Sequence, residues 1–167
     1  MNTLKIFSIA FLSSVTLGFA QDVNQARKAV DAEQYEKAKS ILKSIIKVNP
    51  IDGRANFILG NVYLIQTVTD SAKISFQRGL AGTEGSRLNY IGLGTIDLDN
   101  GNTIAAEANF ALALKDTKKK DIEELVAIGR AYTYSNKPNY KKAIEYLKKA
   151  KAINPNDALA QLAIGDA

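Results

Sequence analysis

The chain has 167 residues, of which 46% are hydrophobic and 23% charged, and its formal net charge is +5. This size and composition suit one folded domain. Cysteine and histidine do not occur, which excludes disulfides, thiolate chemistry and the commonest general base and metal ligand near neutral pH. Catalysis would have to rest on carboxylates, lysine or tyrosine. We therefore expect a protein that is not an enzyme and that holds no cofactor or metal.

Residues 1–20 have the composition of a secretory signal peptide. An apolar run over residues 6–17 follows Lys5, and the small residues Gly18 and Ala20 precede the expected cleavage point. A membrane span needs about 20 apolar residues, and serine and threonine interrupt this shorter run. The sequence therefore predicts a periplasmic or secreted protein without a stable membrane anchor.

The rest of the chain reads as a series of amphipathic helices joined by short turns. The turns are rich in asparagine, aspartate, glycine and proline, as at Asn100-Gly101-Asn102, Asn49-Pro50 and Asn154-Pro155, which are residues that cap or end helices. No sustained alternation typical of strands is present. The predicted helices cover 22–32, 36–48, 54–66, 70–80, 87–99, 103–115, 121–135, 140–153 and 157–167.

Two landmarks recur along the chain with a period of about 34 residues. The first is an alanine followed four residues later by a large apolar residue: Ala38 and Leu42, Ala72 and Phe76, Ala106 and Phe110, Ala143 and Leu147. The second is an apolar residue followed by glycine: Leu59-Gly60, Leu93-Gly94, Ile128-Gly129 and Ile164-Gly165. Such a period is typical of a helical solenoid, in which each helix pair buries its apolar face against the next pair. The small residues are expected where two helices cross closely.

With these landmarks the chain resembles the tetratricopeptide repeat (TPR) family. Its fourth copy carries most of the family pattern: Leu125, Ile128, Gly129, Tyr132, Tyr140, Ala143, Leu147, Ala150 and Pro155. The second copy departs from that pattern at Gly79, where a second alanine is expected, and the third departs at Asp97, where tyrosine is preferred. The resemblance implies an all-α fold, a right-handed α-solenoid of antiparallel helix pairs with four repeats and a partial fifth.

The predicted organisation follows the repeat register. It comprises the signal peptide (1–20), repeat one (21–52), repeat two (53–86), repeat three (87–120), repeat four (121–156) and the first helix of a fifth unit (157–167). In that last helix, Leu159, Leu162 and Ile164 are expected to cover repeat four. Two readings remain for it: a capping helix, or the start of an array that continues in a longer protein with an appended functional domain. We favour the longer protein.

Local motifs that could carry chemistry fit the repeat pattern better. Gly92-Leu93-Gly94 lacks the third glycine and the preceding strand of a nucleotide-binding loop. The Asp97–Gly101 stretch resembles a calcium loop whose glycine arrives one position early and whose twelfth residue is Ala108. Glu123 and Glu124 are adjacent on a helix and point apart, so they cannot bracket a substrate bond.

In the TPR family the first helix of each repeat lines a concave groove, which receives extended peptides or partner helices. The register places an apolar row on this surface: Val23, Phe57, Ile91, Val126 and Leu162. A polar row follows one helical turn later: Arg27, Asn61, Thr95, Arg130 and Asp166. Arg54 and Tyr134 are further groove candidates. The apolar row suits a polypeptide ligand, although it could instead pack against the neighbouring helices.

The leading hypothesis is therefore an exported scaffold that binds a protein or peptide partner through its groove. One alternative is binding of an envelope polysaccharide or other acidic polymer by the lysines of Lys118–Lys120 and of the fourth repeat. We favour the simpler reading, in which those lysines form a solvated helix face with partners such as Glu145 for Lys149. Nucleic-acid binding by a related helical repeat is disfavoured by the export signal, and no nucleic-acid partner is expected.

Overall fold

The computed structural model describes residues 22–115 and 122–167, and within these ranges every regular element is a helix. The helices are 22–31, α2 (Tyr35–Val48), α3 (Gly53–Ile65), α4 (Thr69–Gly79), α5 (Ser86–Asp99), α6 (Thr103–Ala113), α7 (Ile122–Tyr134), α8 (Tyr140–Ile153) and α9 (Ala158–Asp166). Their ends agree with the predicted ranges to within two residues. The predicted signal peptide (1–20) and the run Lys118–Lys120 lie outside the described residues. None of the described helices is both long and apolar enough to cross a membrane.

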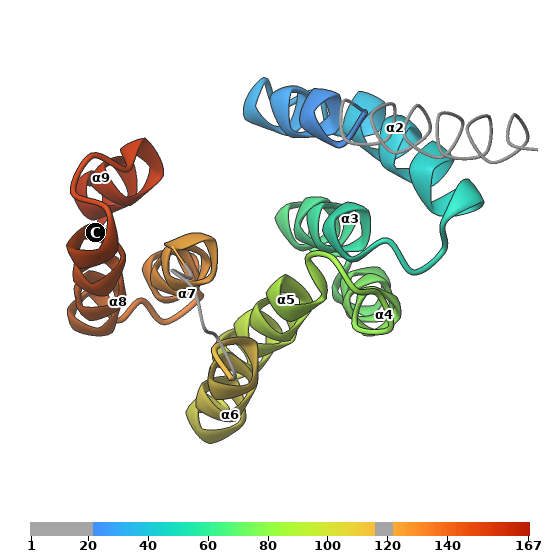
Figure 1. The fold of residues 1–167 in the computed structure, drawn as a ribbon. Coiled ribbons are helices and arrows are strands. Elements are labelled where there is room, and N and C mark those ends of the chain that lie inside the picture. Colours follow the sequence, from blue (N-terminus) through green and yellow to red (C-terminus); the bar gives the residue numbers. More distant parts are fainter. Residues whose placement is uncertain (1–21, 116–121) are drawn as a thin grey trace, which may run out of the picture.

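The helices form antiparallel pairs that stack into an arc (Figure 1). The most extensive helix–helix contacts join α3 to α4, α5 to α6 and α7 to α8, and each first helix also packs on the next, α3 on α5, α5 on α7 and α7 on α9. The first helices lie on the inner side of the arc, whereas α4, α6 and α8 lie on its outer side. This arrangement confirms the predicted all-α solenoid.

The turn residues act as the sequence predicted. Four helices begin with a side chain that accepts a hydrogen bond from the backbone N–H three residues later, which satisfies a donor left unpaired at the helix start. These caps are Asp52, Asn102, Asn139 and Asp157. Gly101 ends α5 with φ +78° and donates its N–H to the carbonyl of Leu98 at 2.9 Å, a left-handed conformation that glycine adopts without strain.

The small landmark residues lie at helix crossings, as predicted, except Gly165, where an added methyl group would meet nothing within 4 Å. The landmark alanines are completely buried: Ala38, Ala72, Ala106 and Ala143. A methyl group added at Gly60 would lie 2.3 Å from the ring of Phe76, and one added at Gly92 would meet the same ring at the same distance. Phe76 therefore occupies the space between α3 and α5, two helices of different repeats. Gly94 meets Phe110 in the same way, and Gly129 meets Leu147.

Gly79, which departs from the repeat pattern, makes room for a buried amide. A methyl group at Gly79 would lie 2.4 Å from Oδ1 of Asn89. Asn89 is fully buried, and its Nδ2 donates a hydrogen bond to the carbonyl of Gly53 at 2.9 Å. The amide thus links the start of α5 to the start of α3, and an alanine at position 79 would exclude it.

The prediction for α9 is wrong for Leu159 and Leu162 and is confirmed for Ile164. Leu159 and Leu162 are exposed, whereas Ala160 and Ala163 are buried against the fourth repeat, and Ile164 packs beside them. The reason is that Ala160, Ala163 and Ile164 recur every three to four residues and so share one helix face. The two leucines lie off that face.

Candidate functional site

The predicted apolar row lies mostly inside the protein. Val23, Ile91 and Val126 are buried among the core residues, so their side chains pack against neighbouring helices. Phe57 is half-buried, with its ring centroid 6.1 Å from that of Phe76. Leu162 is 60% exposed. The packing alternative therefore describes most of this row, and Phe57 and Leu162 are its members that reach the surface.

The predicted polar row is more accessible. Arg27, Asn61 and Thr95 are half-buried, while Arg130 and Asp166 are exposed. At the C-terminal end of the row, Arg130 lies over the ring of Tyr134 at 6.0 Å, and the Tyr134 hydroxyl donates a hydrogen bond to Asp166 at 2.7 Å. That hydrogen bond raises the pKa of Tyr134. Thr95 turns inward and donates its hydroxyl to the carbonyl of Ile91.

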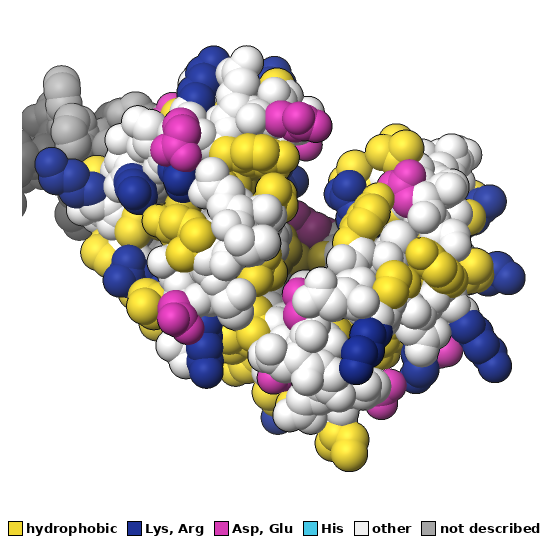
Figure 2. Space-filling model, turned by 180° about the vertical axis from the view of Figure 1, so that it is seen from behind, with side chains coloured by type: hydrophobic (Ala, Val, Ile, Leu, Met, Phe, Trp, Pro, Cys, Tyr) yellow, Lys and Arg dark blue, Asp and Glu magenta, His cyan; other side chains and the backbone are white. Residues whose placement is uncertain are grey.

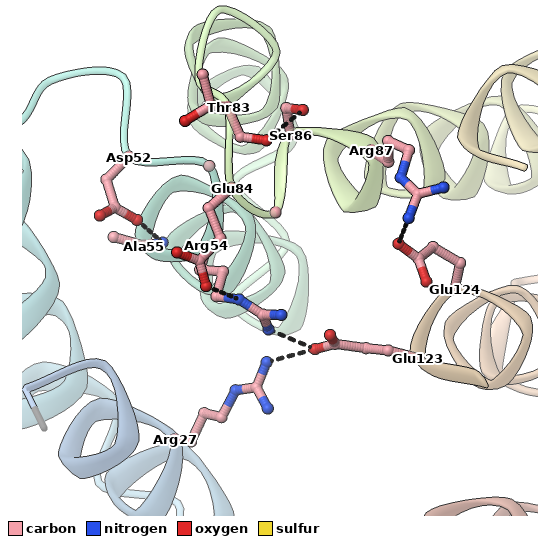
Figure 3. A network of polar contacts seen from close by, with 12 residues as sticks. Arg27, Asp52, Arg54, Ala55, Thr83, Glu84, Ser86, Arg87, Glu123 and Glu124 are labelled. Carbon is pink, nitrogen blue, oxygen red and sulfur yellow. Dashed lines mark hydrogen bonds and ion pairs between the residues drawn. The ribbon is translucent and has the colours of Figure 1, made fainter. Parts of the chain in front are cut away.

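An ion-pair network crosses the concave side of the arc. Arg27, from the helix 22–31, and Arg54, from α3, both donate to the same oxygen of Glu123, from α7 (Figure 3). The distance from Arg27 Nη2 to Glu123 Oε1 is 2.7 Å, and that from Arg54 Nη1 is 2.8 Å. Glu84 approaches Arg54 Nε at 3.3 Å from the turn before α5. Three repeats are thus joined at one carboxylate.

Glycines in adjacent turns hold Arg54 in place. A methyl group at Gly53 would lie 2.4 Å from the carbonyl of Glu84, and one at Gly82 would lie 2.1 Å from the carbonyl of Ile51. Gly85 has φ +70°, and a methyl group added there would meet the Arg54 side chain. Because these glycines lack side chains, the turn before α5 closes against the start of α3. That closure brings Glu84 to Arg54.

A second ion pair lies beside the first. Arg87, in the first turn of α5, donates to Glu124 of α7 at 3.1 Å (Figure 3). Arg54, Arg87 and Glu123 are each the second residue of a first helix. The starts of α3 and α5 thus present arginines, and the start of α7 presents two glutamates.

We call the charged residues at the starts of α3, α5 and α7, together with Arg27, the rim. The helix ends stabilise some of these charges and destabilise others. A helix N-terminus carries a partial positive charge, so it favours the glutamates of α7 and disfavours arginines at the same place. Burial alone would raise the pKa of the Glu123 carboxyl, but the hydrogen bonds from Arg54 and Arg27 outweigh burial and hold its pKa below the usual 4.5. The hydrogen bond to Glu123 likewise raises the pKa of Arg54. Glu123 thus compensates positive charge from two guanidinium groups and a helix end.

The surface beside the network is hollowed. A cavity of ≈ 570 Å³ is lined by apolar Val23 and Ile51 and by charged Arg27, Arg54 and Glu84. A second hollow of ≈ 240 Å³ shares Arg54 and Glu84 with the first and includes Glu123 among its lining residues. Figure 2 shows the concave surface between the N-terminal and C-terminal helices, with acidic side chains within it. Such mixed apolar and charged linings bind polypeptide segments well.

The sequence motifs that were set aside have structural roles. Asp97 accepts a hydrogen bond from the side chain of Asn109 at 2.8 Å, and Asp99 accepts one from the backbone N–H of Asn136 at 2.9 Å. Asp99 thereby links the end of α5 to the turn between α7 and α8. In the part of the chain that the structure describes, no cluster of three or more acidic side chains could hold a metal ion.

The basic face of α8 is partly neutralised within the protein. Lys149 pairs with Glu145 at 2.8 Å, which confirms the predicted i,i+4 pair, and Lys142 pairs with Glu107 of α6 at 3.0 Å. These contacts lower the charge available to an acidic polymer.

Sequence reasoning named Arg27 and Arg54 as groove residues but missed their partners. The adjacent positions of Glu123 and Glu124 argue against a catalytic pair but do not indicate a role in the groove, and nothing in the repeat pattern indicates Glu84 or Arg87. The available signal was the shared second position of Arg54, Arg87 and Glu123 in successive first helices. A further signal in the sequence is the glycines Gly79, Gly82 and Gly85, three residues apart, which indicate a close approach of the chain before α5.

Comparisons with known proteins agree with this architecture. Residues 127–157, which cover most of the predicted fourth repeat (121–156) and the first residue after it, match the profile of the tetratricopeptide repeat. No curated protein sequence matches the chain with significance.

Two solved structures are similar to the chain at low sequence identity. A structure from a functional characterization of Pseudomonas aeruginosa PilF has a TM-score of 0.60 and 18% identity, covering 89% of this chain. The chain spans 66% of the length of that PilF chain. The structure of YrrB, described as a TPR protein with an unusual peptide-binding site, has a TM-score of 0.44 and 21% identity over 85% of this chain and 89% of YrrB. The match at residues 127–157 and the stacked helix pairs support the resemblance inferred from the repeats: this chain contains a tetratricopeptide repeat and has the fold of a TPR solenoid.

Proposed function

We propose that the protein is an exported scaffold that binds a segment of another protein on the inner side of its arc. The observation that carries this proposal is the ≈ 570 Å³ cavity, where apolar Val23 and Ile51 lie beside the guanidinium groups of Arg27 and Arg54. Apolar surface supplies affinity for a ligand, and a few placed polar groups fix its orientation. Catalysis is not part of the proposal.

An extended segment suits this surface better than a compact ligand. The first helices stand side by side along the arc, so groups that contact a ligand recur from repeat to repeat. Phe57, the second member of the predicted apolar row, is half-buried, and exposed Arg130 and Tyr134 lie toward the C-terminal end of the row. A partner chain running along the arc would meet apolar and hydrogen-bonding groups in turn.

Selection of displayed random peptides on the purified protein tests the groove. We expect the selected peptides to lose binding to Asn24→Trp, because Asn24 is an exposed residue lining the cavity and an indole would fill it. Lys148→Ala serves as the control, since Lys148 is exposed on α8, and it should bind the same peptides unchanged. Circular dichroism would verify that both variants remain helical. Equal binding by all three proteins would contradict the groove proposal.

Export is tested by fractionation of a bacterial host that expresses the full chain. We expect the protein outside the cytoplasm, with a mature N-terminus at Gln21 by mass spectrometry. A variant lacking residues 1–20 should stay inside the cell. An uncleaved full-length chain in the cytoplasm would contradict this part of the proposal.

A further inference from the structure

We propose that Arg27 and Arg54 form a carboxylate-binding site for the partner, and that Glu123 occupies this site in the free protein. The proposal rests on the proposed function and specifies its ligand chemistry: a polypeptide segment that carries an aspartate or glutamate next to an apolar residue. Glu123 would act as an internal competitor that the partner's carboxylate displaces.

The geometry of Glu123 is that of a bound ligand. Its carboxylate comes from α7, on the far side of the concave surface from Arg27 and Arg54, with sequence separations of 96 and 69 residues. Both arginines point at one oxygen, Oε1, at 2.7 and 2.8 Å (Figure 3). Each guanidinium carries more N–H donors than these contacts use. An incoming carboxylate could therefore make the same charge-assisted hydrogen bonds.

Because the ion-pair network is partly exposed, replacing the Glu123 carboxylate by that of a ligand costs little free energy. The side chains of Glu123, Arg27 and Arg54 are 34%, 38% and 32% exposed. Ion pairs with this much access to water contribute little net stability, since solvent and salt screen them. Replacing Glu123 by another carboxylate keeps both arginines paired and frees Glu123 to water. A buried pair would not allow this exchange without leaving a costly unpaired charge.

The surroundings select an acidic ligand with an apolar neighbour. Arg54 stands in the first turn of α3, where the helix end adds positive potential. Arg27 and Arg54 also line the ≈ 570 Å³ cavity together with Val23 and Ile51. A carboxylate at the arginines would thus place an adjacent apolar side chain at this cavity.

The alternative is that the network is a brace, with Glu123 only tying repeats one, two and four together. The two ideas differ in their effect on affinity. If Glu123 is a competitor, its neutralisation should strengthen binding of an acidic ligand, because the binding-competent state becomes more populated. If Glu123 is a brace, its neutralisation should leave such binding unchanged or weaken it through loosening of the arc.

The experiment uses random peptides displayed and selected separately on the wild-type protein, Glu123→Gln and Arg54→Gln. Peptides from Glu123→Gln should be enriched in Asp and Glu beside an apolar residue, whereas those from Arg54→Gln should lack this enrichment. One acidic peptide, and a control peptide in which Asn or Gln replaces its acidic residue, would then be titrated into each protein by calorimetry. We expect Glu123→Gln to bind the acidic peptide about three- to tenfold more tightly than the wild type does, with binding of the control peptide unaffected.

The matched control is Glu145→Gln. It removes the same charge from an exposed pair on α8, with Lys149, and should change neither titration. Thermal melts would verify that every variant is folded. Enrichment without acidic residues, or unchanged or weaker binding of the acidic peptide by Glu123→Gln, would overturn the inference and leave the groove proposal standing. Failure of every protein to select a peptide would overturn both.

Discussion

The interior crossings and the charged rim of this solenoid are built on opposite principles. At the crossings, one contact type recurs in successive repeats: Gly60 against Phe76, Gly94 against Phe110 and Gly129 against Leu147. At the rim, equivalent positions carry unlike charges, with Arg54 on α3 and Glu123 on α7, and they pair across repeats that are not neighbours. The crossings are buried and periodic, whereas the ion pairs of the rim are part-exposed and join particular repeats.

This difference separates stability from recognition. A repeated apolar contact adds a similar increment of burial in each unit and makes the units cohere. Part-exposed ion pairs contribute little to stability, so the rim is free to vary without unfolding the array. We therefore expect substitutions at the crossings to act on folding, and substitutions at the rim to act mainly on binding.

The largest effect is expected at Phe76. Phe76→Ala removes a fully buried ring that fills the space between Gly60 and Gly92. We expect a loss of about 3–5 kcal/mol in the free energy of unfolding, from lost burial and the remaining cavity. Urea denaturation followed by circular dichroism would measure it. A loss below about 1 kcal/mol would show that the crossings are not the main source of stability.

Placing a larger side chain at a helix crossing should lower the free energy of unfolding by less than Phe76→Ala does. Ala106→Leu places a larger side chain at a fully buried crossing and should lower the free energy of unfolding by about 1–3 kcal/mol. Ala108→Leu is the control, since Ala108 is exposed on the same helix. Equal melting temperatures for the two variants would contradict the assignment of Ala106 to a crossing.

At the rim, Glu123→Gln should lower the free energy of unfolding by only about 1 kcal/mol, because both of its ion pairs are accessible to water. A double-mutant cycle with Arg54→Gln would isolate the Arg54–Glu123 contribution. A loss as large as that of Phe76→Ala would mean that the rim is a structural element, and the contrast with the crossings would fail.

The smallest effect is a pH dependence of that same contribution. The pKa of Glu123 is lowered in the folded protein relative to its usual 4.5, so its stabilising contribution is fully present above pH 4.5 and is lost as the pH falls through the lower folded value. The difference in melting temperature between wild type and Glu123→Gln should therefore shrink on acidification below pH 4.5. A difference that stays constant down to strongly acidic pH would contradict the ion-pair assignment.

The same contrast explains how far the sequence could be interpreted. The crossings were predictable because a period of about 34 residues repeats each contact, so Ala72 or Gly94 is recognised by its counterparts. The Arg27–Glu123 contact could not be predicted from the sequence, because it depends on how sharply the arc curves between repeats one and four. The phase of α9 was misjudged because apolar character was weighed above helical spacing, and small Ala160 and Ala163 took the buried face instead of Leu159 and Leu162.

Gly79 and Asn89 have a consequence for related sequences. The Asn89 amide fills the space that a side chain at position 79 would need, and it bonds to Gly53 at the start of the preceding first helix. The two positions should therefore covary: a relative that restores alanine at 79 should carry a smaller residue at 89. Aligned homologues that combine alanine at 79 with asparagine at 89 would need a different path of the chain between α4 and α5.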